Sequence, residues 1–439
     1  MKAGARKTLS PLPGVLAEVD GPDRTIRLKV LSAEAGAGAL KEFLYGALNE
    51  HERGYTVVIS GVPFCFLPGA EDHILPACRA RGRRVPACAA CRRRPSCPGL
   101  PPGFSLPPGE SEPLRPVLPA PAEVVFELNR RCNLACGVCV SRGLADELPP
   151  AEVKRQLRAA RRLGVASARF TGGEPFLHPA LPELLAYARK LGFHALLNTN
   201  ATVSGPAAAG RAARHADNIL VSLQGFDARS EAEATGVPGL FAKKLANARL
   251  FRRKVGTLRL GTVLSGRVLK DFSKYLALAR SLKADVWELY RPMPGAGKGD
   301  DAVTPRALRV LAGRLAGEPR DGLQICFANP LPICLFPRPQ APLFLGARFD
   351  DGNTRLVFDP RGFYKPSYYL QENLGADLAQ AWASPLLKRL AALPHLKGIC
   401  RRCELRMRCL GGSRFLAGLD GNLYGPDPWL PRLAAKARP

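Results

Sequence analysis

Short apolar runs alternate with helical patterns through the middle of the chain. A strand followed by a helix, repeated several times, is typical of a parallel sheet covered by helices. Five or six such units are too few for a closed eight-stranded barrel, so we predict an α/β fold with a partial (β/α)6 TIM-type barrel. The predicted strands are 124–128, 167–171, 194–198, 218–223, 258–263 and 286–290, and the predicted helices are 151–163, 181–191, 239–252, 270–282 and 305–316.

A smaller α/β pattern precedes this core. Residues 24–31 and 55–60 have the pattern of strands, and apolar residues recur at helical spacing between Leu40 and Leu48. Eight prolines between residues 99 and 122 indicate an extended connector. Beyond about residue 320 the alternation stops, and prolines, aromatics and cysteines return. The predicted domains are therefore an N-terminal α/β segment with a cysteine motif (1–98), a Pro-rich linker (99–122), the core (123–320), a C-terminal cysteine-rich domain (321–427) and a basic tail (428–439).

Charge and cysteine content narrow the class of protein. The 439 residues include 64 Lys and Arg against 37 Asp and Glu, a net charge of +27, which implies anionic partners or internal anionic groups. No apolar run reaches the roughly 20 residues of a membrane span. The start, with Pro11, Pro13 and Gly14, lacks the apolar stretch of a signal peptide. We therefore expect a cytoplasmic protein whose 13 cysteines are metal ligands rather than disulfides.

The central cysteines are Cys132, Cys136 and Cys139, a C-x3-C-x2-C group directly after the first strand of the core. Three thiolates on one short loop can hold three irons of a [4Fe-4S] cluster and leave the fourth iron open for another ligand. A zinc ion with a distant fourth ligand is the alternative.

This spacing resembles that of the radical S-adenosylmethionine (radical SAM) superfamily. Residues 171–175 (TGGEP) end the second strand like that family's GGEP motif, while 197–200 and 221–225 end the third and fourth strands. The resemblance implies that the three cysteines bind a cluster whose open iron is chelated by S-adenosylmethionine. It also implies reductive cleavage of S-adenosylmethionine to a 5′-deoxyadenosyl radical, which abstracts a substrate hydrogen. The implied cofactor contacts are Val138, Gly172, Gly173, Glu174, Thr199 and Ser222, with the Glu174 carboxylate accepting from the ammonium group.

Two positions depart from the family pattern. Val138 stands where an aromatic residue is usual, and Thr235 stands where an arginine often precedes a glycine. Adenine packing and the hold on the carboxylate of S-adenosylmethionine are therefore expected to differ. No catalytic side chain is assigned beyond the cofactor contacts. Tyr290 and Arg291, at the end of a late strand, are candidates, with a strand-end cap as the alternative.

A second cysteine group lies near the C-terminus. Cys400, Cys403 and Cys409 form C-x2-C-x5-C, with Cys334 upstream. The group resembles the auxiliary-cluster region called SPASM, or its shorter twitch relative, and residues 358–364 resemble that region's hairpin. Ser367 and Ser413 stand where further cysteines are common, which favours one auxiliary cluster in this region over two.

The third group repeats the second. Cys88, Cys91 and Cys97 have the same spacing, and residues 63–68 (PFCFLP) echo 332–337 (PICLFP). With Cys65 and Cys334 as fourth ligands, each copy can saturate one [4Fe-4S] cluster. Zinc is the alternative for both sets. Cys78 could replace Cys65, and Cys326 could replace Cys334. Arginines flank all three groups and would offset the charge of thiolate-bound clusters.

The substrate is inferred from the resemblance. A SPASM-like region most often accompanies maturation of a ribosomally made peptide by crosslinking or oxidation, so a peptide or small protein is the leading substrate, with flavodoxin or ferredoxin as electron donor. RNA modification is the alternative, prompted by the net charge and by a basic helix. A non-enzymatic iron-sulfur electron carrier is the second alternative. The basic helix carries Lys154, Arg155, Arg158, Arg161 and Arg162.

Overall fold

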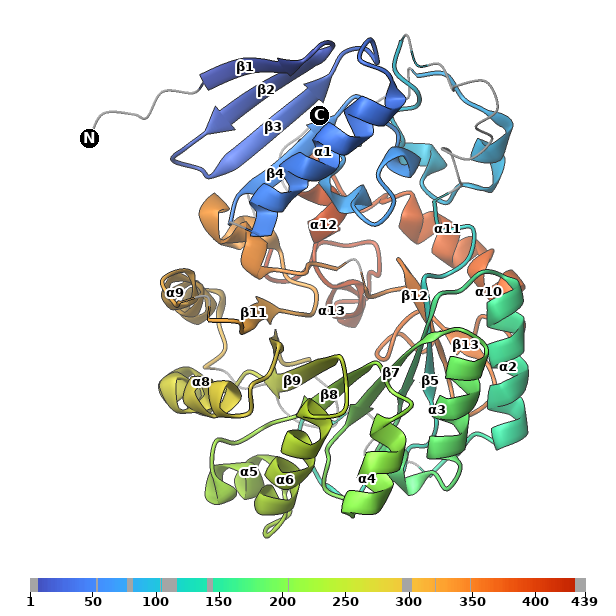
Figure 1. Cartoon of the computed structure of the whole chain (residues 1–439), viewed down its shortest axis with the longest axis vertical. Coiled ribbons are helices and arrows are strands. Elements are labelled where there is room, and N and C mark those ends of the chain that lie inside the picture. Colours follow the sequence, from blue (N-terminus) through green and yellow to red (C-terminus); the bar gives the residue numbers. More distant parts are fainter. Residues whose placement is uncertain are drawn as a thin grey trace. The chain divides into compact units, whose positions relative to one another are not determined.

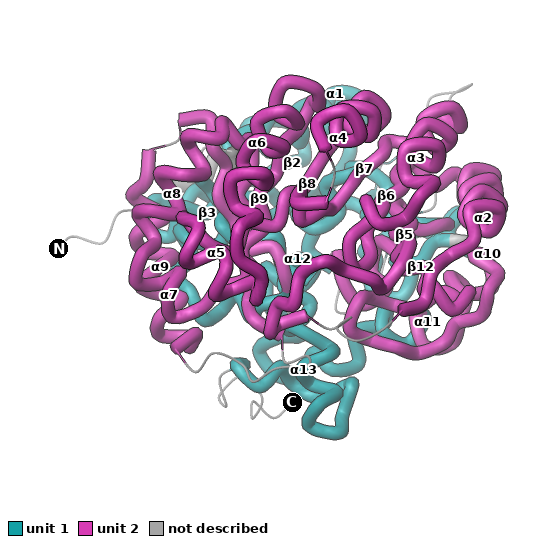
Figure 2. The backbone as a smooth tube through the Cα atoms, turned by 90° about the horizontal axis from the view of Figure 1, so that it is seen from below, with its two compact units in different colours: residues 1–119, 330–348, 388–439 teal, residues 120–329, 349–387 magenta. Residues whose placement is uncertain are grey.

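The computed structural model divides the chain into two units, each built from separate stretches of sequence. Unit 1 comprises residues 1–119, 330–348 and 388–439, and unit 2 comprises residues 120–329 and 349–387 (Figure 2). Cys78, parts of the predicted linker and most of the basic tail lie outside the described residues. The described residues are 7–52, 54–76, 82–102, 104, 117–139, 145–203, 205–293, 302–319, 321–347 and 349–430.

Unit 2 contains the predicted strands in the predicted order. Six neighbouring strands are parallel and follow one another across the sheet in chain order, with helices around their outer side (Figure 1). This confirms the mixed α/β fold with a parallel sheet. The strands are β5 (Glu123–Glu127), β6 (Ser167–Thr171), β7 (His194–Thr199), β8 (Asn218–Ser222), β9 (Thr257–Val263) and β10 (Val286–Tyr290).

The helices of unit 2 follow the sequence patterns closely, with a few differences. Helix α2 buries Val153, Leu157 and Ala160, which recur along one helical face. The helix predicted over 270–282 corresponds to a helix over 272–281. A short helix over 266–270, which was not predicted, precedes it, and Asp271 separates the two because it leaves the helical conformation. The bounds are α2 (Pro150–Arg162), α3 (Leu181–Lys190), α4 (Pro206–Ala213), α5 (Ala228–Thr235), α6 (Phe241–Arg252), α7 (Gly266–Lys270), α8 (Phe272–Ser281), α9 (Pro305–Ala316) and α10 (Leu378–Trp382).

Three further strands extend the sheet at both edges. Strand β11 (Gln324–Phe327) pairs in parallel with β10, and β12 (Arg355–Phe358) pairs in parallel with β5. Strand β13 (Tyr364–Lys365) returns antiparallel to β12, which forms the hairpin expected over 358–364. The described part of the sheet thus has the order β11-β10-β9-β8-β7-β6-β5-β12-β13.

Unit 1 is built on a smaller sheet. Strands β1 (Lys7–Leu12), β2 (Val15–Asp20) and β3 (Thr25–Val30) are antiparallel, and β4 (Thr56–Ser60) joins β3 in parallel after helix α1 (Ala37–Glu52), which crosses the sheet (Figure 1). The core between them contains Leu28, Leu40, Leu44 and Ile59. Helices α12 (Arg406–Cys409) and α13 (Arg414–Leu419) come from the C-terminal stretch, and α11 (Pro385–Ala391) precedes them.

Glu404 ties three stretches of unit 1 together. Arg27 of β3 donates to both of its carboxylate oxygens, at 2.6 and 3.2 Å, and Arg338 approaches it to 3.1 Å.

None of the described helices is long and apolar enough to cross a membrane.

A charged network lies among the strands of unit 2. Arg169 of β6 donates two hydrogen bonds, of 3.0 and 2.9 Å, to the carboxylate of Glu123 on β5. Both side chains are largely buried. Burial alone would raise the pKa of Glu123, but the charge of Arg169 outweighs it and lowers the pKa to about 2. The carboxylate therefore stabilises the fold above its unfolded pKa, and this contribution is lost as the pH falls toward 2.

We expect Arg169→Met to lower the free energy of unfolding by about 3 kcal/mol, because it leaves a buried carboxylate without its bidentate partner. The double variant E123Q/R169M should recover part of the loss. Urea unfolding followed by circular dichroism at pH 7 measures both. Arg309→Met, at an exposed position of α9, is the control and should change stability by less than about 0.5 kcal/mol. A value for R169M equal to the control would contradict the role of this pair.

Candidate functional site

The three central cysteines lie on one loop after β5, at the carboxyl edge of the parallel sheet. Cys132 is exposed, and Cys136 and Cys139 are half-buried. The amide of Leu134 donates to the Cys132 sulfur at 3.4 Å. Burial raises the pKa of Cys136 to about 11, and the neighbouring Cys132 and Cys139 add to the shift. The structure therefore places the three predicted ligands on one loop, at the edge where active sites of parallel βα folds lie.

Gly172 and Gly173 let the loop that leads into Cys132 rest directly on the end of β6. A β-carbon on Gly172 would lie 2.3 Å from the Asn129 carbonyl oxygen, and one on Gly173 would lie 2.2 Å from that of Arg131. The two backbones are joined by hydrogen bonds from the amide of Gly173 to Asn129 at 2.7 Å and from that of Glu174 to Arg131 at 2.8 Å. Only glycine allows this approach.

Glu174 is fully buried, and both of its carboxylate oxygens accept hydrogen bonds from the chain. Thr199 donates its hydroxyl at 2.7 Å, the amide of Asn200 donates at 2.7 Å, and the amide of Phe176 donates at 3.0 Å. Burial raises the pKa of the carboxyl group, and these donors oppose that shift. Glu174 and Thr199, two predicted cofactor contacts, thus bond to each other and fasten the end of β6 to that of β7.

A small amide network, which the sequence analysis did not assign, connects β7 with the cysteine loop. Asn200 donates through Nδ2 to the Asn133 side-chain oxygen at 2.9 Å and toward the Cys132 sulfur at 3.6 Å. Asn133 donates in turn to the hydroxyl of Thr202 at 2.8 Å. The only sequence signal was position, since Asn133 follows Cys132 and Asn200 follows Thr199.

The end of β8 is held by a buried ion pair. Lys244 of α6 donates to the Ser222 carbonyl at 2.7 Å and pairs with Glu231 of α5, whose other oxygen accepts from the amides of Gln224 and Gly225 at 3.0 and 2.6 Å. Thr235 donates its hydroxyl to the carbonyl of Glu231 at 2.7 Å, so it bonds within its own helix. Ser222, a predicted cofactor contact, is thus positioned by residues that sequence reasoning missed.

The remaining predicted residues have distinct surroundings. Tyr290 donates its hydroxyl to Glu288, which also pairs with Arg259 at 2.6 Å, and burial raises the Tyr290 pKa well above its usual value. Arg291 is buried, and its backbone amide and carbonyl both bond to Asn329 at 2.7 Å. Val138 is 41% exposed.

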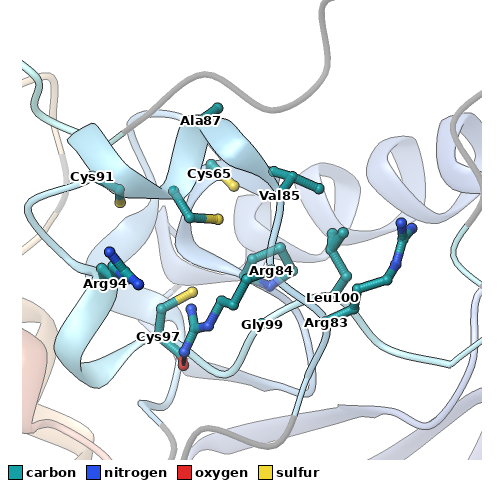
Figure 3. Close-up of a pocket in the computed structure, with 12 residues that line it drawn as sticks. Cys65, Arg83, Arg84, Val85, Ala87, Cys91, Arg94, Cys97, Gly99 and Leu100 are labelled. Atoms are coloured by element: carbon teal, nitrogen blue, oxygen red, sulfur yellow. Dashed lines mark hydrogen bonds between the residues drawn. The ribbon is translucent and has the colours of Figure 1, made fainter.

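The four N-terminal cysteines line one cavity of about 20 Å³ in unit 1. Cys65 lies on the short helix η1 (Phe64–Phe66), Cys88 on η3 (Pro86–Ala90), and Cys97 directly after η4 (Arg94–Ser96). Figure 3 shows the sulfur atoms of Cys65, Cys91 and Cys97 turned toward a shared space. Burial raises the pKa of Cys65 to about 12, and the other three cysteines contribute to the shift because they lie close by.

The four C-terminal cysteines line a second cavity in unit 1, of about 350 Å³. Cys334 lies on η6 (Ile333–Leu335), Cys400 on η8 (Gly398–Arg402), and Cys409 ends α12. The amide of Ile333 donates to the Cys409 sulfur at 3.5 Å. Cys326 lies on β11 of unit 2 and not in this cavity. Within the described ranges, no three or more His, Cys, Asp or Glu side chains stand close enough to hold a metal ion.

The sequence repeat is also a repeat of backbone conformation. Cys65 and Cys334 each occupy the middle of a three-residue 3-10 helix that follows an extended proline. Cys88 and Cys400 each occupy the third position of a five-residue 3-10 helix. The next cysteine, Cys91 or Cys403, then donates its amide to the carbonyl three residues earlier, at 3.3 Å in both copies. The two thiol sites are therefore built in the same way.

Comparisons with known proteins agree with this geometry. Residues 126–279 match the profile of the radical SAM superfamily. A PqqA peptide cyclase of Xanthomonas euvesicatoria pv. vesicatoria is 28% identical over 71% of this chain and 88% of its own length, and an AdoMet-dependent heme synthase of Methanosarcina barkeri is 29% identical over 42% and 55%. Streptococcus suis SuiB bound to S-adenosylmethionine is similar in fold, with a TM-score of 0.60 and 21% identity over 71% of this chain and 77% of that one. SuiB bound to the precursor peptide SuiA gives a TM-score of 0.58 at 20% identity, over 70% and 75%.

The parallel sheet, the three-cysteine loop and the matched profile define the class. Residues 126–279 are a radical SAM domain, and the comparisons support a radical SAM enzyme whose cofactors are a [4Fe-4S] cluster and S-adenosylmethionine.

We expect Glu174→Gln to lower the free energy of unfolding by about 1–3 kcal/mol, because one backbone amide would then face an amide nitrogen instead of an oxygen. Binding of S-adenosylmethionine should weaken as β6 and β7 separate at their ends. Urea unfolding and calorimetric titration of S-adenosylmethionine into the reconstituted protein measure the two effects. Glu183→Gln on α3, whose side chain is 61% exposed, is the matched control. Unchanged stability and affinity in E174Q would contradict this role.

Proposed function

We propose that this radical SAM enzyme modifies a ribosomally made peptide by crosslinking or oxidation. The radical chemistry in this proposal rests on the three-cysteine loop seated on the GGE segment at the carboxyl edge of the sheet. The similarity to peptide cyclases, which extends over most of both chains, supports a peptide substrate. So does the shared fold with SuiB, which has been seen bound to its precursor peptide.

The basic helix α2 gives less support to RNA as substrate, because most of its basic side chains have partners on the protein. Lys154 pairs with Glu183, Arg155 with Glu152 at 2.6 Å, and Arg158 donates to the Tyr187 hydroxyl at 3.0 Å. A charged face with such local pairs is an ordinary solvated helix surface.

The residues of the site lie on the cysteine loop and at the ends of β6, β7 and β8, and each group has a different role. Cys132, Cys136 and Cys139 hold the cluster, and Asn200 donates toward the Cys132 sulfur. Gly172 and Gly173 seat the loop, and Glu174 fixes the neighbouring strand end. When bound, the cluster and S-adenosylmethionine supply a radical that can take a hydrogen atom from the substrate. The ion pair of Lys244 and Glu231 holds the β8 end where Ser222 would meet S-adenosylmethionine.

We further propose that each of the two repeated thiol sites holds one auxiliary [4Fe-4S] cluster. The N-terminal set is Cys65, Cys88, Cys91 and Cys97, and the C-terminal set is Cys334, Cys400, Cys403 and Cys409. A zinc ion requires four sulfurs about 2.3 Å from one centre. The C-terminal thiols surround a cavity of about 350 Å³, which leaves room for a cluster between them. For the N-terminal set, the support is that its cysteines repeat the backbone conformation of the C-terminal set. Both sets have all four ligands, so neither leaves an iron open for S-adenosylmethionine.

Metal analysis separates the three sites. Protein reconstituted without oxygen should contain about twelve irons per chain. Replacement by Ala of all four cysteines in either auxiliary set, or of the three central cysteines, should remove about four irons each. Zinc in place of iron at an auxiliary site would contradict the cluster proposal there. Cys326→Ala is the control, because Cys326 lies outside both cavities, and it should keep the full iron content.

Product analysis tests the reaction. With dithionite, the wild-type protein should convert S-adenosylmethionine to 5′-deoxyadenosine, and the variant C132A/C136A/C139A should not. Co-expression with short peptides encoded beside the gene, followed by mass spectrometry, should reveal a peptide that has lost two hydrogens. Cleavage without any modified peptide, combined with a modified nucleoside in co-purified RNA, would instead favour the RNA alternative.

A further inference from the structure

The N-terminal thiol site has positive charge at its rim that the carboxylates of the described residues do not balance. Arg83, Arg84 and Arg94 line the cavity together with the four cysteines (Figure 3). Arg83 and Arg94 are exposed and Arg84 is half-buried. Their resolved hydrogen bonds go to backbone carbonyls, from Arg83 to Phe104 at 3.1 Å and from Arg84 to Cys97 at 2.8 Å. None of the three pairs with a carboxylate within the part of the chain that the structure describes.

A fourth arginine, Arg93, is buried inside the site. Arg93 is only 5% exposed, its amide donates to the Cys91 sulfur, and its guanidinium lies near Cys91, Glu71 and Asp72. Its Nε and Nη1 have no hydrogen-bond partner among the described residues. A buried guanidinium is costly unless an anion lies close to it. Arg93 therefore lies among the anionic groups Glu71, Asp72 and Cys91 inside the site, whereas Arg83 and Arg94 lie exposed at its rim.

The C-terminal site does not share this surplus. Its cavity is lined by Arg338 and Arg406. Arg338 pairs with Glu404 at 3.1 Å, and Arg406 donates to the Pro76 carbonyl at 2.6 Å. Arg338 therefore has a carboxylate partner and Arg406 is buried. Among the described residues, exposed arginines without a carboxylate partner line the N-terminal cavity and not the C-terminal one.

We propose that Arg83, Arg84 and Arg94 form the docking surface for an acidic one-electron carrier protein, which delivers electrons to the N-terminal site. The proposal rests on the auxiliary cluster proposed above. The reduced carrier gives one electron to the oxidised cluster and is itself oxidised by one electron, and no bond or proton changes. An uncompensated basic rim attracts an acidic surface and raises the rate of encounter, most strongly at low salt.

The apolar core of unit 1 lies next to both thiol sites. Cys97 and Met407 are buried in the same apolar core, and Met407 stands two residues before Cys409 of the C-terminal site. The apolar core of unit 1 therefore extends from a cysteine of the N-terminal site to a residue next to the C-terminal site.

Charge reversal at the rim of the full-length, reconstituted enzyme tests the docking surface. The variant R83E/R94E is compared with R306E/R309E, which reverses the same number of charges on exposed positions of α9. The probe is a purified reduced flavodoxin. Its affinity is measured by titration, and its electron transfer is measured by stopped-flow bleaching of the cluster absorbance. We expect R83E/R94E to bind about tenfold more weakly and to be reduced more slowly, with the difference vanishing near 0.5 M salt. Reduction by dithionite and the iron content should equal those of the wild type.

Other results would overturn either the docking surface or the cluster proposal. Wild-type binding and reduction in R83E/R94E, with full iron content, would overturn the docking surface and leave the cluster proposal intact. Iron absent from the N-terminal site of the wild-type enzyme would overturn the cluster proposal instead. If single-stranded RNA displaces flavodoxin from the wild type and R83E/R94E loses RNA binding, the rim is a nucleic-acid surface. The variant R83Q/R94Q keeps the test decisive if the reversed charges impair folding, because it removes the charge alone and should show a smaller loss in the same direction.

Discussion

The backbone contact between Gly172–Gly173 and the segment before Cys132 is the constraint on which the site depends. It leaves no space for a β-carbon, and its two amide hydrogen bonds fix the height of the cysteine loop above the sheet. The next residue, Glu174, links this segment to the neighbouring strand, because its buried carboxylate accepts hydrogen bonds from Thr199 and Asn200 at the end of β7. A loop that must present three thiols to one cluster is thus held by backbone geometry rather than by its own short sequence.

The parts of the fold that can be predicted from the sequence are those that local pattern determines. The six parallel strands of unit 2 are apolar runs bounded by turn residues, and the cysteine groups stand out by spacing alone. Strands β11 and β12 were missed because each has only four residues, and each exists by pairing with the edge of a sheet already formed. The hydrogen bonds of Glu174, Asn200 and Lys244 were missed because their partners lie far away along the chain. Their roles follow from the tertiary fold and have no local signature.

The repeated thiol sites show how much a short motif can specify. In both copies a proline and a three-residue 3-10 helix present one cysteine, and a five-residue 3-10 helix presents the next. What differs is the surroundings. The arginines that line the C-terminal cavity are committed to internal partners, whereas the N-terminal copy carries a rim of charge that faces outward. The two copies of the motif thus share a backbone conformation and differ in the charge of the surface around them.

The divided sequence of unit 1 sets an order of assembly during synthesis. Its first 119 residues leave the ribosome before the barrel, yet Glu404, which grips Arg27 of β3, and Met407, which completes the core around Cys97, arrive only near the end. The barrel, whose first six strands lie within one continuous stretch, has no such delay. The apolar core of the N-terminal segment is therefore completed only when nearly the whole chain has been translated.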